Sequence, residues 1–533
     1  MSNDGGSFGR WDWVTAAFFF TVSLALHVPF RSQLTYHWDG AQFALSIGAF
    51  DMRMGQPQPP GYFLYVMLGK FVNLFVGEPH TSLVWLSVVA GAALPAVGFL
   101  LAKAMFGRAV GIATAVILAT SPLCWFHSEV ALTSIVDAVL VTSTVLACWT
   151  AIRHGGRWRD VFWLSVLFAA VMGVRQQSGA ILLPIWCYAL LRFRRPRWPR
   201  VLAAVLLTGL FCALWFVPMV SKTGGVAEYL HLLQAKGRFD APKTMWGGGG
   251  MNALLTNVSM IARACWVGLL LAAVILVGEF FYWVFGERAE VKQQLYKERV
   301  EQIRVLAAWI VPMILFWLIM YVTMPGYVLC FFPGLAIMTG IAMERFAGRL
   351  ARFFDARKVT RGRRWKIVPA ILTVGSVAGI NVMVFAWQPK YLNSMLGGLP
   401  LTRVEIKRHD QQLSACFRVI RQKFDPENII IYHSDQFFYW GFRQFQYHLP
   451  EYRNVLLSSD SSLSGDLRRK PWMAQHRRTT FIDSTDDLPG RIALLIVPPQ
   501  ESVQAFNRYF DVSTAELMVE SGVKLYLVKR SDR

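Results

Sequence analysis

The sequence predicts a polytopic α-helical membrane protein that ends in a small soluble α/β domain. Of its 533 residues, 54% are hydrophobic, 16% are charged and 20 are Trp, which is more apolar than expected for a soluble chain of this length. Long apolar segments recur up to about residue 390, and the basic residues gather between them. The net charge of +21 is therefore explained by the positive-inside rule rather than by a nucleic-acid partner.

Eleven apolar segments are predicted to cross the membrane, with the N-terminus inside and the C-terminus outside. Two neighbouring segments, Val161–Val174 and Gly179–Leu191, are short for a span of about 20 residues. The loops before and after this pair, Arg153–Arg159 and Arg192–Arg200, are both strongly basic. Both loops should be cytoplasmic, so the chain between them must leave and return. The predicted segments are approximately Trp13–Phe30, Thr81–Ala104, Val110–Phe126, Leu132–Ile152, Val161–Val174, Gly179–Leu191, Val201–Val220, Ala264–Phe285, Val305–Thr323, Val328–Met343 and Ile367–Trp387.

Residues 1–400 form the predicted membrane domain, and residues 401–533 form the predicted extracytoplasmic α/β domain. From about Leu401 the composition becomes that of a soluble protein in which helices and strands alternate. The expected helices are Thr402–Phe424, Gln436–Tyr447 and one near Ser502–Tyr509. The expected strands are Asn428–Tyr432, Val455–Ser458, Thr479–Ile482, Ile492–Val497 and Lys524–Val528.

Two further segments have expected roles at the membrane surface. The short apolar stretch Tyr62–Val76 is expected to lie along the surface as an interfacial helix. The segment Ser221–Ser259 is expected to be a long outer loop between two spans. Its glycine run, Gly247–Gly250, is interpreted either as a flexible linker or as a mobile lid.

The polar stretch Gln33–Val66 follows the first span and carries the leading functional candidate, Asp39. An ionisable residue so close to the membrane is a functional candidate; the alternative is a solvated loop carboxylate. A carboxylate can take a proton from a hydroxyl, and Arg can bind a phosphate through two parallel hydrogen bonds, which suits a reaction on a phosphate-bearing lipid. The other polar candidates on the same predicted side are Gln42, Arg53, Gln58, Tyr62, Glu129, Asp137, Arg175, Gln176 and Tyr327.

Several of these side chains also have a purely structural interpretation. Asp137 fits a hydrogen bond to a neighbouring helix, and Glu129 fits a turn or helix-start carboxylate. Arg175 fits an interfacial residue whose charge reaches water, and Tyr327 fits an interfacial aromatic residue. The seven Cys residues have no paired spacing, and Asp39 has no clear set of neighbouring metal ligands, so no cofactor is indicated and a divalent cation is the one candidate.

The first outer loop places an acidic residue just after the first span, in Trp38-Asp39-Gly40-Ala41-Gln42-Phe43. About 20 residues on, Gln56-Pro57-Gln58-Pro59-Pro60-Gly61-Tyr62 opens a juxtamembrane helix, and Ser128-Glu129 leads to Asp137. This arrangement resembles the GT-C glycosyltransferases, and most of all the protein O-mannosyltransferase and lipid A aminoarabinose transferase group. The similarity in organisation covers roughly residues 10–390. Two positions depart from it: Gly40 stands where several relatives have a second acid, and Gln58 stands where they often have Lys or His.

The resemblance implies an inverting transfer of a sugar from a polyprenyl-phosphate donor to an acceptor hydroxyl on a lipid, glycan or protein. The reaction would take place on the outer face of a membrane, expected to be a bacterial inner membrane. The resemblance also implies that Asp39 is the general base, that Glu129 or Asp137 is a second carboxylate, and that Arg175 contacts the donor phosphate.

Three other functions are compatible with parts of the sequence. A membrane transporter or lipid flippase is the main alternative, but no internal repeat is visible. A receptor or assembly protein would leave the Asp39 stretch without a role. A lipid phosphatase or ligase would use similar surface chemistry and stays open.

Overall fold

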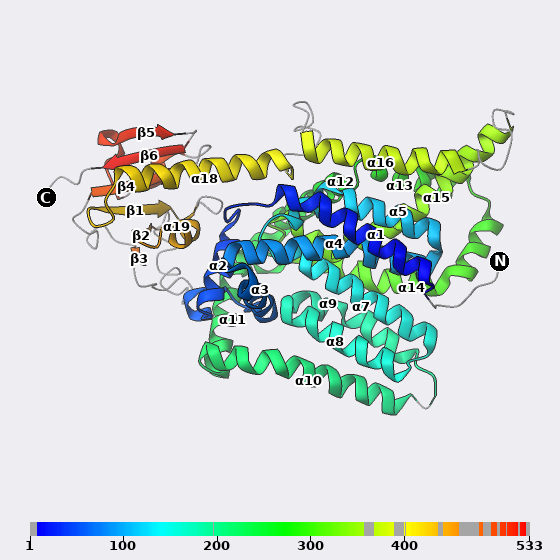
Figure 1. Ribbon diagram of the computed structural model, residues 1–533. Helices are drawn as coiled ribbons and strands as arrows, with labels where there is room; N and C mark the ends of the chain where they lie inside the picture. Colours follow the sequence, from blue (N-terminus) through cyan, green and yellow to red (C-terminus); the bar gives the residue numbers. More distant parts are fainter. Residues whose placement is uncertain are drawn as a thin grey trace.

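The computed structural model describes residues 8–195, 197–356, 367–387, 399, 401–434, 441–457, 479–482, 492–497, 502–507, 509–520 and 523–528. A bundle of long helices forms the larger part of the molecule, and a small sheet lies at one end of it (Figure 1). The first described helix, α1, begins at the opposite end of the bundle from this sheet. The fold therefore separates two ends, and the candidate site lies at the end that carries the sheet.

The bundle is built mostly from apolar helices. Its first half contains α1 (Arg10–His27), α2 (Trp38–Gly48), α3 (Phe63–Val76), α4 (Pro79–Phe106), α5 (Arg108–Thr120), α6 (Pro122–Ser128), α7 (Ser134–His154), α8 (Trp158–Val174) and α9 (Gln176–Leu191). Its second half contains α10 (Trp198–Thr223), α11 (Val226–Asp240), α12 (Gly250–Leu269), α13 (Leu271–Phe281), α14 (Ala289–Ile319), α15 (Phe332–Ala356) and α16 (Val368–Trp387).

Among the described residues, six helices are long and apolar enough to cross a membrane, or up to eight candidates if each of two bent helix pairs counts as one span. The chain is therefore an integral membrane protein. Each of the eleven predicted segments coincides with a helix or a bent helix pair, although α8 and α9 have only 17 and 16 residues. The stretch expected to lie along the membrane surface is also helical, as α3.

Two predictions on the second half of the bundle were wrong in their local structure. The eighth segment is not one straight helix, because α12 and α13 meet at an angle of 106° at Leu270, whose φ is +48°. The expected outer loop Ser221–Ser259 is largely helical, since α11 and the first half of α12 lie within it. The sequence of α11 does place Val226, Tyr229 and Leu233 at helical spacing. Its many polar residues lower the mean hydropathy of the segment, so it was interpreted as a loop.

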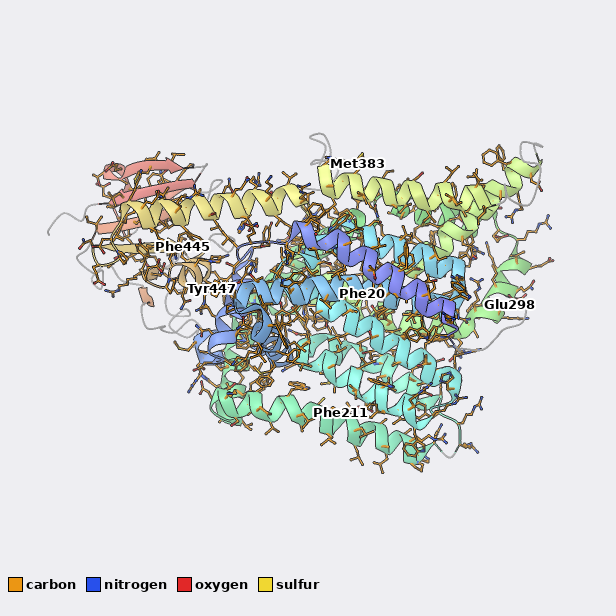
Figure 2. All side chains as sticks on the ribbon, in the orientation of Figure 1. Phe20, Phe211, Glu298, Met383, Phe445 and Tyr447 are labelled. Carbon is orange, nitrogen blue, oxygen red and sulfur yellow. The ribbon has the colours of Figure 1, made fainter. Side chains whose placement is uncertain are left out.

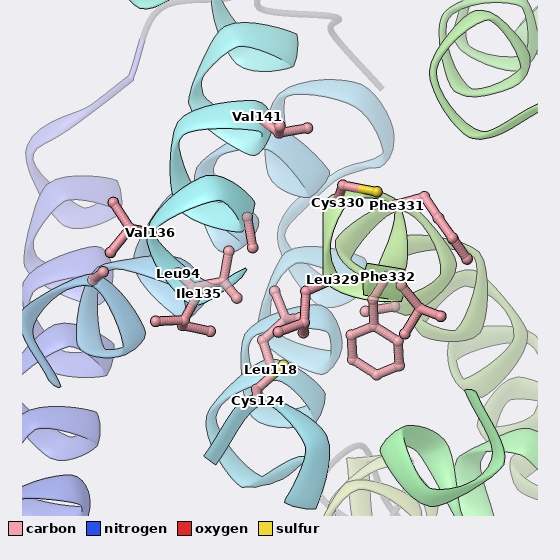
Figure 3. Packing of buried hydrophobic residues seen from close by; sticks show 14 of the residues in the cluster. Leu94, Leu118, Cys124, Ile135, Val136, Val141, Leu329, Cys330, Phe331 and Phe332 are labelled. Carbon is pink, nitrogen blue, oxygen red and sulfur yellow. The ribbon is translucent and has the colours of Figure 1, made fainter. Parts of the chain in front are cut away.

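The core of the bundle is a continuous apolar cluster to which most of its helices contribute, among them α4, α5, α6, α7 and α15. In Figure 3, Leu94 of α4, Leu118 of α5 and Ile135 of α7 point toward Leu329 and Phe332. Leu329 lies in the 3-10 helix η6 (Pro325–Cys330), and Phe332 begins α15. This packing fixes the positions of α6 and α7, and with them the ends of the helices that carry the polar candidates.

The C-terminal part contains one long helix, one short helix and a six-stranded sheet. The helices are α18 (Arg403–Lys423) and α19 (Phe442–His448); the strands, in the order β3-β2-β1-β4-β6-β5, are β1 (Ile429–Ser434), β2 (Arg453–Leu457), β3 (Thr479–Ile482), β4 (Ile492–Val497), β5 (Glu516–Glu520) and β6 (Val523–Val528). Strands β3, β2, β1 and β4 are parallel, and β6 and β5 are antiparallel to their neighbours. The α/β prediction therefore matches the observed elements.

Some details of this part differ from the predictions. The sequence analysis missed β5, and the helix expected near residues 502–509 is only the 3-10 turn η10 (Val503–Phe506). Residues 436–440 of the second predicted helix lie outside the described residues.

The C-terminal part contacts the loop between α1 and α2 directly. Asp410 of α18 accepts hydrogen bonds from the backbone N–H groups of Gln33 and Leu34, at 2.8 and 3.1 Å. From α19, Arg443 donates to the carbonyl oxygen of Met54 at 2.9 Å, and the hydroxyl of Tyr447 pairs with Glu78 at the start of α4. Figure 2 labels Tyr447 and Phe445 at this junction. The first loop is thus held from both the bundle and the C-terminal part.

We expect Gly91→Ala to lower the thermal stability of the protein. Gly91 lies in α4, and a Cβ atom there would come within 2.0 Å of the Ser128 hydroxyl oxygen in α6. Overpacking of this kind typically costs about 1–3 kcal/mol. The control is Gly209→Ala in α10, where a Cβ atom would have no neighbour within 4 Å, and where Ala is the better helix former.

The measurement is the apparent unfolding midpoint of detergent-solubilised protein. Gly209→Ala should leave the midpoint unchanged or raise it. Equal midpoints for the two variants would contradict the close α4–α6 packing.

Candidate functional site

Asp39 lies in the first turn of α2, with its side chain 21% exposed. The His37 ring accepts a hydrogen bond from the Asp39 backbone N–H at 3.1 Å and so caps the helix. The side-chain amide of Gln58 donates to Asp39 Oδ1 at 3.0 Å. One carboxylate oxygen is therefore held by a neutral donor, while the group as a whole stays accessible.

The segment 51–62 is a compact corner that brings Gln58 to Asp39. Asp51 and Gln56 pair as an isolated β-bridge, and the Gln56–Pro57 and Pro59–Pro60 peptide bonds are cis. Gly61 has a φ of +113°, and a Cβ atom there would lie 2.7 Å from the sulfur of Met219 in α10. Only glycine fits at this close approach.

Arg175 lies at the break between α8 and α9, where its backbone is extended (φ −149°, ψ 97°). Its guanidinium carbon lies 4.6 Å from the ring centre of Tyr327 and 5.6 Å from that of Trp317, two rings that stack on each other. Its Nη1 is 4.0 Å from Asp137 Oδ2, and its Nε has no hydrogen-bond partner among the described residues. The side chain is only 4% exposed, so this cation is held by aromatic faces rather than by water.

Two tyrosines connect Asp39 with Arg175. Tyr62, just before α3, and Tyr327 both lie within electrostatic range of Asp39 and of Arg175. Burial raises the pKa of both phenols, whereas Arg175 acts in the opposite direction. The carboxylate and the guanidinium therefore share one partly buried polar region.

Gln176, next to Arg175, connects this region to the 51–62 corner. Its amide nitrogen donates to the carbonyl oxygen of Pro60 at 3.2 Å, and its amide oxygen accepts from the Tyr229 hydroxyl at 3.1 Å. Gln42 lies one turn beyond Asp39 in α2, buried, with an amide oxygen that has no hydrogen-bond partner among the described residues. The structure thus brings together the predicted residues Asp39, Gln42, Gln58, Tyr62, Arg175, Gln176 and Tyr327, which we call the Asp39 cluster.

The remaining predicted residues have other surroundings. Arg53 is half exposed and makes a bidentate pair with Asp51, at 2.9 and 2.8 Å. Asp137 is buried in the first turn of α7 and accepts from the Ser178 hydroxyl at 2.7 Å; it borders the Asp39 cluster through Arg175. These contacts account for both residues structurally.

Glu129 lies in the turn between α6 and α7 and is fully buried. Neither carboxylate oxygen has a hydrogen-bond partner among the described residues, and His27 Nδ1 of α1 is 3.7 Å from Oε1. Burial raises the pKa of this carboxyl group well above its ordinary value, although Trp125 and Arg403 lower it. Its carboxylate faces the end of α1, and its backbone carbonyl oxygen accepts from the Ser32 N–H at 2.9 Å.

The sequence placed Lys236 on the predicted outer side but did not single out Asp240 and Lys243, with which it forms an ionic group at the end of α11. Asp240 pairs with Lys236 at 2.8 Å and with Lys243 at 3.5 Å, and the Lys243 ammonium lies 3.8 Å from the ring centre of Phe239. Burial lowers the pKa of Lys243, whereas Asp240 raises it. Asp240 also acts electrostatically on Tyr62 and Tyr327. The missed signal was the i, i+4 spacing of Lys236 and Asp240 in a segment that had been interpreted as a loop.

We find no candidate metal site in the described part of the chain. No group of three or more His, Cys, Asp or Glu side chains lies close enough there to bind one ion. In the Asp39 cluster, Asp39 can accept a proton and Arg175 can bind an anion.

Comparisons with known proteins bear on the family resemblance and on the fold. A family model for dolichyl-phosphate-mannose-protein mannosyltransferases matches residues 58–221. The structure of ArnT from Cupriavidus metallidurans bound to undecaprenyl phosphate is similar, with a TM-score of 0.54 and 13% identity, covering 97% of each chain. The apo structure of the same ArnT gives 0.55 and 13%, covering 97% of this chain and 98% of that one. A search of curated protein sequences gives no match. The resemblance to GT-C glycosyltransferases is confirmed, and the fold is ArnT-like.

We expect Glu129→Gln to raise thermal stability at pH 8 and to have a smaller effect at pH 5. Burial raises the pKa of the folded carboxyl group, so the wild-type protein loses stability as the pH rises above about 4.3, where the unfolded chain gives up this proton. Gln is similar in shape and does not titrate.

The measurement is the apparent unfolding midpoint at both pH values. The exposed Glu427→Gln is the matched control and should show no such pH-dependent difference. If Glu129→Gln lowered the midpoint equally at both pH values, a buried, neutral Glu129 would be ruled out.

Proposed function

We propose that this protein is a membrane glycosyltransferase that moves a sugar from a polyprenyl-phosphate donor to an acceptor hydroxyl. The observation that supports it most is the Asp39 cluster, in which an accessible carboxylate and a buried guanidinium share one polar region. The ArnT-like fold adds support, because the similar ArnT structure has undecaprenyl phosphate bound. The sugar, a hexose or a pentose, and the class of acceptor are open in this proposal.

We place the cluster on the extracytoplasmic side of a bacterial inner membrane. The loops rich in Lys and Arg alternate with the loops that carry Asp39 and Arg175 along the eleven predicted spans, and the positive-inside rule puts the basic loops in the cytoplasm. The N-terminus is then cytoplasmic, and residues 401–533 form an extracytoplasmic domain. On that side the donor carries its activated sugar on a lipid phosphate, so no nucleotide is needed.

In the proposed reaction Asp39 is the general base. The acceptor oxygen attacks the anomeric carbon while Asp39 takes its proton, and the bond between that carbon and the phosphate oxygen breaks. A single displacement of this kind inverts the anomeric carbon. Gln58 occupies one oxygen of Asp39, which fixes the orientation of the carboxylate and leaves the other oxygen for the proton.

Arg175 is the proposed contact of the leaving phosphate. The phosphate departs with the electrons of the broken bond, and a guanidinium can stabilise that charge through charge-assisted hydrogen bonds. The Nε of Arg175 has no hydrogen-bond partner among the described residues, so the guanidinium retains donors for such a ligand. The rings of Tyr327 and Trp317 fix its plane, which reduces the entropy lost on binding.

We expect Asp39→Asn to lower sugar transfer by about 10²–10⁴-fold, because an amide cannot take the proton from the acceptor. The measurement is transfer from a radiolabelled polyprenyl-phosphate sugar in membranes, with the unfolding midpoint as a check on folding. Asp511→Asn, an exposed carboxylate in the C-terminal part, is the matched control and should keep full activity. Unchanged transfer by Asp39→Asn would move the base to Asp137 or Glu129.

We expect Arg175→Lys to lower kcat and to weaken inhibition by the product polyprenyl phosphate. Lys keeps the charge but loses the planar fork that stacks on Tyr327 and binds phosphate bidentately, so an effect of about tenfold is expected, with a larger one for Arg175→Met. Arg53→Met is the control, because Arg53 is already paired with Asp51. Equal losses for the Arg53 and Arg175 variants would argue against a specific phosphate contact at Arg175.

A further inference from the structure

An apolar groove opens between α13, α14 and α15, at the end of the bundle away from the C-terminal sheet. Its volume is about 610 Å³, within the range of about 300–1,000 Å³ that is usual for small-molecule sites. Its apolar wall includes Leu276 and Phe280 of α13, Ile303 and Val311 of α14, and Met338 of α15. Figure 2 labels Glu298 of α14 at this end, far from Phe445 and Tyr447.

Three cationic side chains line the same groove, namely Lys292, Arg299 and Arg345. All three are partly buried. None of them makes an ion pair within 4.0 Å with any described residue. Lys292 does donate a hydrogen bond to the Val284 carbonyl oxygen at 2.8 Å, but this contact does not neutralise its charge. A partly buried cation beside an apolar wall is costly unless an anion accompanies it.

The acidic side chains near the groove do not neutralise these cations. Glu279 lines the groove, but it is buried against Arg349, with which it forms an ion pair. Glu344 is exposed and lies within electrostatic range of Arg299 and Arg345. With Glu344 counted against the three cations, a positive charge of two remains.

The order of residues along the helices separates a cationic end of the groove from an apolar end. In α14 the cations Lys292 and Arg299 precede Ile303–Val311, and in α15 Arg345 follows Met338–Ala342. From Arg299 to Val311 a helix rises about 18 Å, a length that accommodates much of an acyl chain. The groove is therefore suited to an amphiphile with an anionic head and an extended apolar tail.

We propose that this groove binds an anionic phospholipid of the surrounding membrane, with its phosphate near Lys292, Arg299 and Arg345 and one acyl chain along α14. Basic pockets between membrane helices are known to recognise anionic head groups. The proposed substrate lipid is the less suitable occupant, because the Asp39 cluster lies at the other end of the bundle, beside the C-terminal part.

The test is native mass spectrometry of the full-length protein in detergent, with phosphatidylglycerol and phosphatidylcholine added separately. The wild-type protein should retain phosphatidylglycerol preferentially. The double variant Arg299→Gln, Arg345→Gln should bind it about tenfold or more weakly, because two head-group contacts are lost. Arg288→Gln is the matched control, because this exposed residue lies at the start of α14 but does not line the groove.

A second variant separates the groove itself from a general loss of charge. Ala307→Trp places a bulky ring in the apolar wall from an exposed position and keeps all cations, so it should also weaken phosphatidylglycerol binding. Equal retention of the two lipids by the wild-type protein, or equal losses in the double variant and Arg288→Gln, would overturn the proposal.

The polyprenyl-phosphate substrate is tested as a rival occupant in the same experiment. If undecaprenyl phosphate displaced phosphatidylglycerol from the wild-type protein but not from the double variant, the groove would be a substrate site and the proposal would be wrong. Asp39→Asn should retain phosphatidylglycerol as the wild-type protein does, so the result is independent of the proposed catalytic role.

Discussion

The hydrogen bonding of the loop between α1 and α2 is the constraint on which the candidate site depends. Beyond the 3-10 turn η1 (Val28–Phe30), this loop has no helix or strand to satisfy its backbone N–H groups, so these groups need other partners. Asp410 accepts from Gln33 and Leu34, and His448 accepts from Thr35 at 3.3 Å. Burial raises the pKa of Asp410 to about 6, against the hydrogen bonds that lower it. The C-terminal part thus supplies what the loop lacks, and Asp39 follows four residues later.

The two charged groups of the Asp39 cluster both come from places where a helix begins or breaks. Asp39 opens α2, and Arg175 separates α8 from α9. Irregular backbone near a membrane is tolerated only where protein or water satisfies it. Here the Arg175 N–H donates to the Val171 carbonyl oxygen at 2.7 Å, and the Arg175 carbonyl oxygen accepts from Gly179 at 3.3 Å. The extended backbone of Arg175 ends α8 and also turns the Arg175 side chain toward Tyr327. One backbone conformation therefore accounts for both the helix break and the position of the cation.

Hydropathy and charge could predict most of the helical plan, because both depend on single residues in sequence order. They could not predict the 106° bend at Leu270, which depends on a local backbone conformation, or α11, whose apolar positions are hidden among charges. Hydropathy and charge also do not show which side chains surround Arg175 and which surround Glu129. Both are charged residues at predicted turns, but only the folded structure shows that Glu129 lies beside His27 and Arg175 beside Tyr327.

The surroundings of Arg175 also suit a ligand that must leave after each turnover. A cation that bound the product phosphate without competition would slow its release, and binding energy gives rate only where it is greater in the transition state. Asp137, 4.0 Å from Arg175, offsets part of its charge, and the rings of Tyr327 and Trp317 hold the guanidinium without using its Nε. The cations Lys292, Arg299 and Arg345 lack an ion-pair partner within 4.0 Å among the described residues, which suits a lipid that stays. In the two proposals the charge balance therefore differs: Asp137 offsets the single charge of Arg175, whereas Glu344 leaves an excess positive charge of two in the groove.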